Sequence, residues 1–556
     1  MDTQTAAPPG VHSPRWPART MARRLTTWAA FALGGVVLFA AYLRISRTRP
    51  VNSDGASNAL QAWDMLHGNL LLHGWWLSDV SFYTTELPQY MLVEAVRGPN
   101  ADVVHVAAAV TYTLLVLLSA LLARGDATGR EAALRMALAA GIVLAPQLGT
   151  GAYVLLLSPD HVGTSVFVLA TWLVLDRAGR RWWVPPAMAA LLGWGLVGDR
   201  LVLYIAVVPL AGVCALRAWT DVVVRRRPLA QARFELALAV AAVAAVPVAW
   251  IAAALIRAHG GYRVWGVRVA LTATSELPRH LRLALDGIAV LYGASFTGLN
   301  PGLAVALAAV HLAGLALAGW ALWLGLRRFL APGTSLVTAV LPAAVVINLV
   351  LYLLSTRVAD LRSARDMAGV LPFGAVLAGR LLAGRLLDGR LRAVMAPVLA
   401  AVLLGYAAAL VYGAAQPPVP AAGSQLATWL ASRDLHYGVG AYWNANAVSL
   451  ASGGSVQVRA VCYGGGRFTA LRWEVKSSWY DRSRHRADFL VLAPRSRTSC
   501  LNPTYPQLRA TFGPPAGAYR VGPDTVLVWN TNLLARIHVA QAGGPVSRGR
   551  APPSPR

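Results

Sequence analysis

The sequence has 556 residues, of which 56% are hydrophobic and only 13% are charged, and its mean hydropathy is +0.51. A soluble protein of this length needs more charge to cover its surface, so the composition excludes an ordinary soluble enzyme. The formal net charge of +26 comes almost wholly from arginine, because Lys476 is the single lysine, and much of it falls between apolar windows. This basicity therefore does not indicate nucleic-acid binding.

The N-terminal residues 1–24 are polar and basic, and the apolar stretch after them is too long for a cleavable signal peptide. We interpret 1–24 as a cytoplasmic N-terminus followed by a signal anchor. Further apolar windows make 25–412 an α-helical, polytopic membrane domain. The windows predict about eleven transmembrane helices, at 25–43, 103–123, 132–150, 161–176, 184–198, 201–217, 235–256, 301–325, 335–355, 367–384 and 394–412.

Short, arginine-rich connections set the predicted orientation, because such segments remain in the cytoplasm. They are 124–130, 177–181, 217–233, 327–328 and 385–392. With the N-terminus inside, an odd number of spans places the C-terminal region outside the cytoplasm, in a multi-pass protein of the cell membrane. Three external segments are long or charged for reasons other than topology: 44–102, 257–300 and 357–366.

The first external loop, 44–102, is the most informative segment. Asn52, Ser53 and Asp54 are typical of a helix start, and the helix is expected to run to about residue 67. At helical spacing Asp54, Asn58 and Gln61 share one face. The pattern predicts a helix along the membrane surface with a polar ridge facing a cavity or water. The simpler alternative is that Asp54 only stabilises the helix N-terminus.

Other charged residues at the predicted outer face are also candidates. Asp79 and Glu86 lie in the first loop among Trp and Tyr residues, which either anchor the protein at the interface or stack against a sugar. Asp160 and His161 begin one span, and Asp199 lies in a tight turn between two others. The external arginines suit a lipid phosphate, or else bulk anionic headgroups; those we select are Arg263, Arg268, Arg362 and Arg365.

The C-terminal region begins after a Pro-rich linker, 413–424, and forms a predicted small α/β domain over 425–540. A helix is expected at 425–434 and strands at 456–462, 489–493 and 525–529. Cys462 and Cys500 either form a disulfide, if the domain is external, or remain free thiols. No residues show metal-ligand spacing. The tail 541–556 is predicted to be disordered.

An acidic residue directly after the first span, in a long external loop, resembles the GT-C membrane glycosyltransferases, with the bacterial protein-mannosyltransferase-like branch the nearest in layout. Three further segments are similar to that group. They are LSPDHVGTSVFVLATWLVLD (157–176), RSARDMAGVLPFGAVLAGR (362–380) and HYGVGAYWNANAVSLASGG (436–454).

The resemblance implies a hexosyl or pentosyl transferase that moves a sugar from a polyprenyl-phosphate carrier to a glycan, lipid or protein acceptor at the outer face, inverting the anomeric centre. Asp54 matches the carboxylate that acts as general base. Gly55 replaces the second member of the acidic pair that the family often carries, which leaves Asp79, Glu86 and Asp160 as alternative bases. Some relatives require a divalent cation and others do not; Asp54 and Asp160 would hold it.

On this interpretation the remaining selected residues bind substrate: Asn58, Gln61, Asp160, His161, Asp199, Arg263, Arg268, Arg362 and Arg365. Two other functions are compatible with a polytopic chain. A lipid or glycan transporter or flippase would carry inverted repeats and mid-span carboxylates, and neither is evident. A non-catalytic cell-envelope scaffold would keep the same residues as a binding site.

Overall fold

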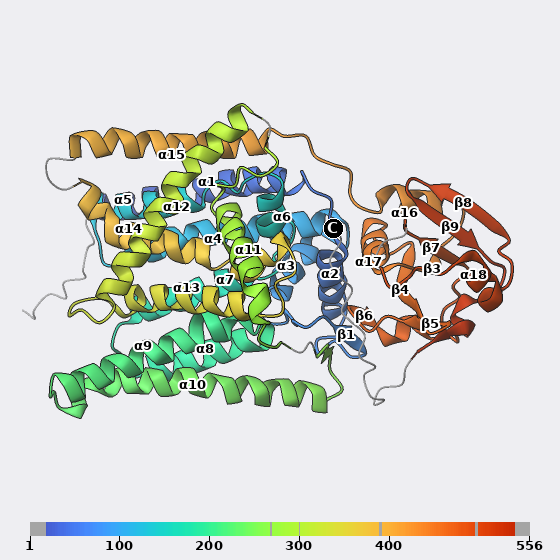
Figure 1. The fold of residues 1–556 in the computed structure, drawn as a ribbon, viewed down its shortest axis with the longest axis horizontal. Coiled ribbons are helices and arrows are strands. Elements are labelled where there is room, and N and C mark those ends of the chain that lie inside the picture. The colour runs from blue at the N-terminus through green and yellow to red at the C-terminus, as the bar shows by residue number, and fades with distance from the viewer. Residues whose placement is uncertain (1–17, 267–268, 300, 388–391, 495–498, 540–556) are drawn as a thin grey trace, which may run out of the picture.

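The computed structural model describes residues 18–266, 269–299, 301–387, 392–494 and 499–539 (Figure 1). Most of the predicted cytoplasmic N-terminus, Arg268 and the predicted disordered tail lie outside these residues. A helical body fills one side of the molecule and a smaller region with a β-sheet fills the other (Figure 1). The prediction of a polytopic helical membrane protein with a C-terminal domain of strands and helices is confirmed.

Seven helical segments within the described residues are long and apolar enough to cross a membrane, and an eighth follows if one bent pair counts as a single span. The seven are α1 (Ala18–Ser46), α4 (Asp102–Arg124), the continuous unit of η1 (Leu203–Val207), α9 (Val208–Trp219) and η2 (Thr220–Val224), then α10 (Leu229–Ala258), α12 (Leu303–Arg328), α13 (Leu336–Leu354) and α15 (Arg392–Ala414). The bent pair joins η4 (Leu361–Met367) to α14 (Val370–Leu387) at 51°.

The three remaining predicted spans also correspond to helices, but these helices are shorter than the seven long segments. They are α5 (Gly129–Val143) with 15 residues, α7 (Val162–Ala178) with 17 and α8 (Val184–Gly198) with 15. At about 1.5 Å per residue such helices reach roughly 22–26 Å, less than a typical hydrocarbon core. They pack against longer neighbours, α5 against α14, α7 against α4 and α8 against α10.

Close backbone approach holds the helical body together, since lipid gives no hydrophobic driving force between helices. At Gly379 on α14, an added Cβ would lie 2.6 Å from the backbone oxygen of Arg135 on α5. Any larger residue there would separate these two helices. Trp172, Tyr112 and Phe373 fill the interior and are almost completely buried.

The predicted first external loop, 44–102, forms α2 (Ser53–Leu66), β1 (Trp75–Leu77) and α3 (Leu87–Arg97). Helix α2 lies between the helical body and the C-terminal domain (Figure 1). It packs against α3, α4 and, on its other side, α17 (Tyr442–Ala451) of the C-terminal domain. Its predicted polar ridge is therefore buried between two parts of the protein rather than turned toward water.

The C-terminal domain contains a seven-stranded mixed sheet in the order β10-β5-β4-β3-β7-β9-β8. The strands are β3 (Tyr437–Gly440), β4 (Gln457–Gly464), β5 (Arg467–Ala470), β7 (Phe489–Leu492), β8 (Gly517–Val521), β9 (Asp524–Val528) and β10 (Ile537–His538). The central strand β3 runs parallel to both β4 and β7. Helices α16 (Ser424–Ala431), α17 and α18 (Tyr505–Phe512) complete the domain.

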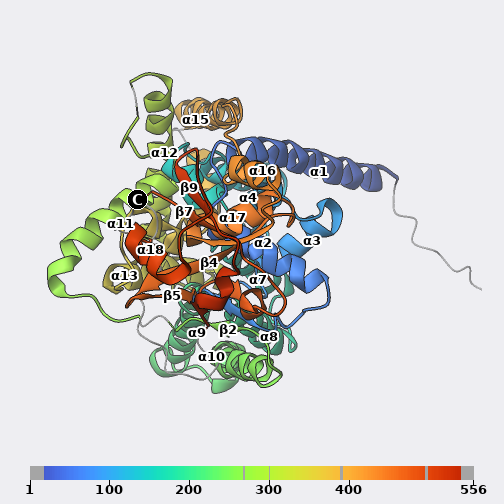
Figure 2. The ribbon, with the colours of Figure 1, turned by 90° about the vertical axis from the view of Figure 1, so that its right-hand side faces the viewer.

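A second, three-stranded sheet joins this domain to the external loops. Strand β1 pairs in parallel with β2 (Arg263–Val264) of the second loop and antiparallel with β6 (Val475–Lys476) of the C-terminal domain. The Lys476 ammonium lies 2.9 Å from the Asp64 carboxylate on α2. Figure 2 shows the C-terminal domain in front of the helix ends. Three chain segments far apart in sequence thus meet at one face.

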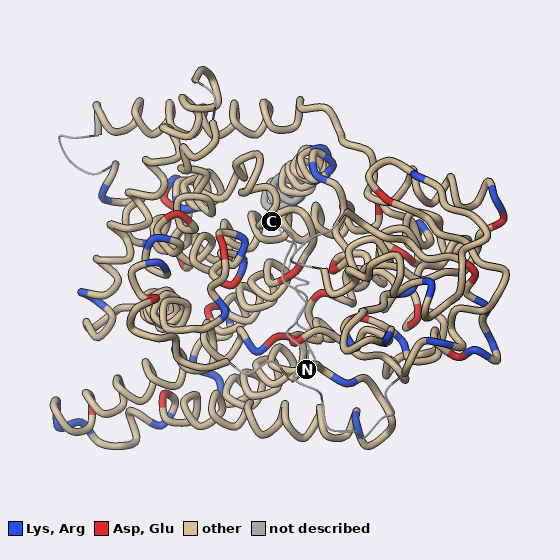
Figure 3. The backbone as a smooth tube through the Cα atoms, turned by 45° about the vertical axis from the view of Figure 1, so that its right-hand side comes forward, with Lys and Arg blue, Asp and Glu red and all other residues tan. Residues whose placement is uncertain are grey.

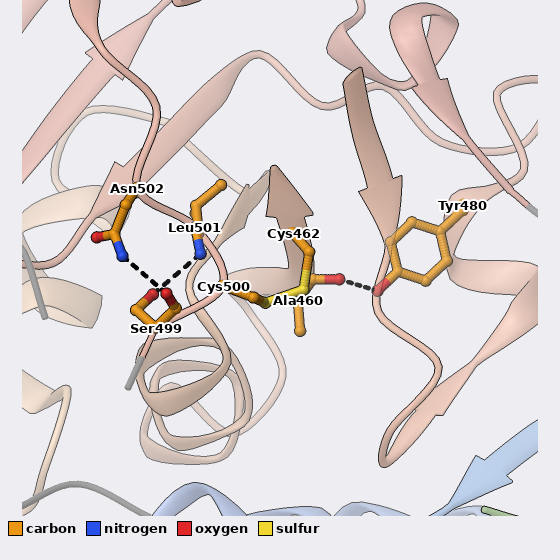
Figure 4. Close-up of a disulfide and its surroundings, with 7 residues drawn as sticks. All are labelled: Ala460, Cys462, Tyr480, Ser499, Cys500, Leu501 and Asn502. Carbon is orange, nitrogen blue, oxygen red and sulfur yellow. Dashed lines mark hydrogen bonds between the residues drawn. A yellow bond between two sulfur atoms is a disulfide. The ribbon is translucent and has the colours of Figure 1, made fainter. Parts of the chain in front are cut away.

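The C-terminal domain carries a disulfide, and the opposite end of the helical body carries arginines. Cys462 on β4 and Cys500 form a disulfide with a Cα–Cα distance of 4.9 Å, beside the hydrogen bond from Tyr480 to the Ala460 carbonyl (Figure 4). Arginines lie at the ends of the helices that point away from this domain (Figure 3), among them Arg124 on α4 and Arg328 on α12.

Candidate functional site

Asp54 lies in the first turn of α2, but it does not cap the helix. Asn52 does so, accepting a hydrogen bond from the Gly55 N–H at 2.9 Å. Asp54 Oδ1 instead accepts a hydrogen bond from the Tyr442 hydroxyl at 2.5 Å, and its Oδ2 lies 3.9 Å from Arg365 Nη1. Burial raises the pKa of Asp54, while the Arg365 charge and the Tyr442 hydroxyl oppose that rise.

The missing acidic pair has a steric reason. A Cβ at position 55 would lie 2.8 Å from Val104 Cγ1 and 3.2 Å from the Ser158 Cβ. An acidic side chain after Asp54 would therefore clash with the span behind it. In this chain the second carboxylate near Asp54 comes from another segment, that of Asp160, whose charge also raises the pKa of Asp54.

Asp160 is tied to the polar ridge of α2. Its Oδ1 accepts from Asn58 Nδ2 at 2.9 Å and its Oδ2 accepts from Ser158 Oγ at 2.8 Å. Gln61, the third member of the ridge, donates to Ser57 Oγ at 3.0 Å and leaves its own Oε1 buried without a partner among the described residues. The structure thus brings Asp54, Asn58 and Asp160 together.

A divalent cation does not fit this arrangement as it stands. The oxygens of Asp54 and Asp160 already face N–H and O–H donors. Mg²⁺ and Ca²⁺ take six or more oxygen ligands. Within the described part of the chain, no group of three or more His, Cys, Asp or Glu side chains is placed to hold a metal. The Asp54 and Asp160 carboxylates are therefore held by protein donors and not arranged around a cation.

Glu86 lies deeper than Asp54 and is fully buried. Its Oε1 accepts from the Thr164 backbone N–H at 2.8 Å and from the Thr164 hydroxyl at 2.9 Å, and its Oε2 accepts from Thr85. Burial, together with the Asp199 charge, raises the pKa of Glu86 to about 8. Near neutral pH this carboxyl is therefore mostly protonated and is a poor general base.

Asp199 and His161 form a buried pair next to Glu86. Asp199 Oδ2 lies 2.7 Å from His161 Nδ1 and 2.8 Å from the Thr164 hydroxyl, and its Oδ1 accepts from the Leu201 N–H at 2.8 Å. The other imidazole nitrogen, Nε2, lies 3.5 Å from Asp366 Oδ1. Asp199 thus holds the Nδ1 of His161 toward itself and leaves Nε2 facing the cavity described below.

The predicted arginines separate into two places. Arg365 faces Asp54, and the Arg362 guanidinium lies 4.8 Å from the Tyr153 ring centroid with a buried Nη1 that has no hydrogen-bond partner among the described atoms. Arg263 lies elsewhere, 5.4 Å from the Trp76 ring. It lines a separate cavity of about 300 Å³ between the external loops and the C-terminal domain.

A cavity of about 540 Å³ opens beside His161, Asp199 and Asp366. Its lining combines charged or ionisable side chains with apolar side chains of α13 and of the segment 269–271. The charged or ionisable residues are Asp79, His161, Asp199, Arg200, Arg357 and Asp366; the apolar residues include Val269, Leu271, Leu351 and Leu354. Asp79 forms an ion pair with Arg357. A lipid with an anionic head likewise combines a charged part with an apolar part.

Three residues of the site were not selected from the sequence: Tyr442, Glu474 and Asp366. Tyr442 lies in a segment that the resemblance had marked, 436–454, and Asp366 lies at the end of the charged third external segment. Glu474 carried no signal of its own. It reaches the site only because the C-terminal domain packs on α2.

No protein-family model and no curated protein matches the sequence. Solved structures do match. ArnT from Cupriavidus metallidurans in the apo state is 15% identical, with a TM-score of 0.52 over 92% of this chain and 99% of that one. ArnT bound to undecaprenyl phosphate is 13% identical, with a TM-score of 0.51 over 90% and 98%. An Archaeoglobus fulgidus oligosaccharyltransferase, 13% identical, gives 0.46 over 82% and 68%. By its similarity to ArnT, this chain has the GT-C fold.

Proposed function

We propose that this protein is an inverting membrane glycosyltransferase that uses a polyprenyl-phosphate sugar as donor. The observation that carries the proposal is the position of Asp54, which faces Tyr442 and Arg365, while the residue after Arg365, Asp366, lines a cavity with both charged and apolar side chains. ArnT, which has the same fold, has been solved with undecaprenyl phosphate bound.

In the proposed reaction the acceptor hydroxyl oxygen attacks the anomeric carbon of the donor sugar. The bond between that carbon and the phosphate oxygen breaks, and polyprenyl phosphate leaves with the electron pair as an anion. Asp54 takes the proton of the acceptor hydroxyl as general base. Attack from the face opposite the leaving group inverts the anomeric centre.

The leaving phosphate needs positive charge where its own charge develops. Arg357 lines the 540 Å³ cavity, and His161 lines it with its Nε2 away from Asp199. Arg365, which faces Asp54, is followed in sequence by Asp366 of the cavity lining. The apolar residues of the lining, among them Leu351 and Leu354, suit the first isoprene units of the carrier.

We also propose that the N-terminus is cytoplasmic and that the C-terminal domain and Asp54 lie outside the cytoplasm. The basic connections at the ends of α4 and α12 support this orientation, as does the Cys462–Cys500 disulfide, because disulfides persist in oxidising compartments. A membrane-impermeant thiol reagent that labels Ser483→Cys in intact cells would support it. Labelling only after the membrane is opened would overturn it.

The test of the function is transfer in membranes that contain this protein, with a panel of labelled polyprenyl-phosphate sugars and endogenous acceptors. Wild type is expected to consume at least one donor and release polyprenyl phosphate in equal amount. A protein that binds such lipids but consumes none of them would instead fit the scaffold, and one that moves them across the bilayer unchanged would fit the transporter.

A further inference from the structure

The Tyr442 hydroxyl lies between two carboxyls, and the second belongs to the C-terminal domain. Tyr442 Oη is 2.5 Å from Asp54 Oδ1 and also within hydrogen-bond distance of Glu474 Oε2. Glu474 is 2% exposed, so water does not separate these groups. A phenol has a single proton to donate, so two close contacts with carboxyl oxygens require one further proton.

The surroundings decide which carboxyl carries the further proton. Asp54 faces Arg365, which favours its ionised form. The groups that act on Glu474 are Asp54, Asp160 and the hydroxyls of Tyr442 and Ser78. Burial and then the Asp54 charge raise the pKa of Glu474 well above its ordinary value. Lys476, two residues along, is paired with Asp64 at 2.9 Å.

The backbone around Glu474 holds this carboxyl in position. Glu474 has a φ of +52°, a conformation that non-glycine residues adopt at an energetic cost. Its carbonyl oxygen faces Ser57 Oγ of α2 and Asn446 Nδ2 of α17, each at 3.4 Å. The next residue begins β6, which pairs with β1 of the first external loop. Glu474 is thus fixed where the C-terminal domain meets α2.

We propose that Glu474 is a positioning residue of the transfer reaction: as a neutral acid it donates to the Tyr442 oxygen, so that the Tyr442 hydroxyl donates to the Asp54 carboxylate. The proposal rests on the function proposed above. It gives the C-terminal domain a direct part in the chemistry, because docking of that domain completes the hydrogen bonds that aim the base. Glu474 itself does not touch the acceptor or the donor.

The shared proton also makes transfer depend on pH. At high pH Glu474 loses its proton, and a second negative charge then competes with Asp54 for the single Tyr442 proton. Transfer is therefore expected to fall on the alkaline side. The groups facing the Asp54–Tyr442–Glu474 bridge, from every element packed on it, are Asp79, Tyr90, Tyr153, Asp160, Arg362 and Arg365. They are unchanged in the variants below, so differences between profiles report on the bridge.

The experiment compares kcat against pH for wild type, Glu474→Ala and Glu474→Gln in the full-length protein. Glu474→Ala removes the donor to Tyr442 and should lower kcat by roughly 10-fold near neutral pH, with donor KM changed by less than about 2-fold. Glu474→Gln still donates to the Tyr442 oxygen and cannot ionise, so it should recover most of that loss and lack the alkaline fall. Tyr442→Phe removes the hydroxyl that joins Glu474 to Asp54, so the kcat profile of this variant should also lack the alkaline fall. Wild-type profiles in all variants would overturn the proposal.

A second readout does not depend on transfer. Infrared difference spectra of wild type minus Glu474→Gln, at neutral pH, should show the C=O stretch of a protonated carboxyl. Glu94→Gln is the positive control, because burial raises the pKa of Glu94 to about 9 and its own acid band should appear in the same kind of difference spectrum. A carboxylate band in place of the acid band would overturn the proposal even if transfer is active. An acid band in a protein without transfer would refute the proposed function and leave the proton assignment intact.

Discussion

Asp54 and Glu86 belong to the same external loop, yet the structure surrounds them in opposite ways. Asp54 faces a guanidinium and a phenol and keeps 17% of its side chain exposed. Glu86 is fully buried, accepts hydrogen bonds from Thr85 and Thr164, and lies close to the Asp199 charge. The comparison favours Asp54 over Glu86 as the proposed base, because a general base must be ionised and reachable.

The largest expected effect comes from removing the charge of Asp54. Asp54→Asn keeps the shape of the side chain but cannot accept a proton, so transfer should fall by about 10²–10⁴-fold. The measurement is the initial rate of transfer at equal protein level. Glu94→Gln is the matched control in the same loop: its carboxyl is 1% exposed, and burial raises its pKa to about 9, so it is already neutral near pH 7. Equal rates in both variants would contradict the role given to Asp54.

The next effect concerns the donor cavity. Arg357→Gln removes a positive charge from the cavity lining and leaves Asp79 without its ion-pair partner. We expect donor KM to rise by roughly 10-fold, because a charged hydrogen bond to the phosphate is lost. Arg433→Gln, on the exposed side of the C-terminal domain beside Trp429, serves as the arginine control. If both variants bind donor alike, the lipid phosphate does not occupy this cavity.

The disulfide should affect stability more than chemistry. Changing both Cys462 and Cys500 to Ser should cost about 2–4 kcal/mol of unfolding free energy, measured as the loss of the C-terminal domain's thermal stability. Transfer below the unfolding temperature should change by less than roughly 3-fold. The chain has three cysteines, so thiol titration of denatured wild type should find one free thiol before reduction and all three afterwards. Three free thiols at the start would mean that the bridge does not form.

The last prediction sharpens the contrast between Asp54 and Glu86. Glu86 has a folded pKa of about 8, above the 4.5 of an ordinary Glu, so the folded state binds more protons than the unfolded state between those pH values. The free energy of unfolding is therefore expected to fall as pH rises through this interval, by at most roughly 1.4 kcal/mol for each step of one in pH. Glu86→Gln should have a flatter dependence of thermal stability on pH. A slope equal to wild type would show that Glu86 is ionised in the folded protein.

Hydropathy predicted the spans because a bilayer requires about 20 apolar residues for each crossing. It placed α8 at its observed bounds and α7 within two residues, but it extended α5 to residue 150, although that helix ends at Val143. The helix carrying Asp54 followed from its capping residues and periodicity. Tyr442 and Glu474 could not be placed in the same way, because their burial depends on contacts across several hundred residues of chain.

The grouping of the predicted external arginines also depended on contacts that the sequence alone does not reveal. The sequence grouped Arg263 with Arg362 and Arg365 because all three lie outside the predicted spans. The structure places Arg263 beside Trp76 in a different cavity, since β2 pairs with β1 rather than with the segment around Arg365. Charge and predicted topology can therefore identify the face on which such residues lie, but only strand pairing separates them on that face.

The most direct test of the central claim is the anomeric configuration of the sugar after transfer by the wild-type protein, determined by NMR against the configuration in the donor lipid. If Asp54 only removes a proton from the acceptor hydroxyl, the acceptor attacks in a single displacement and the configuration is inverted. A retained configuration would mean that a protein group, not the acceptor, attacks the sugar first, and it would contradict Asp54 as a general base.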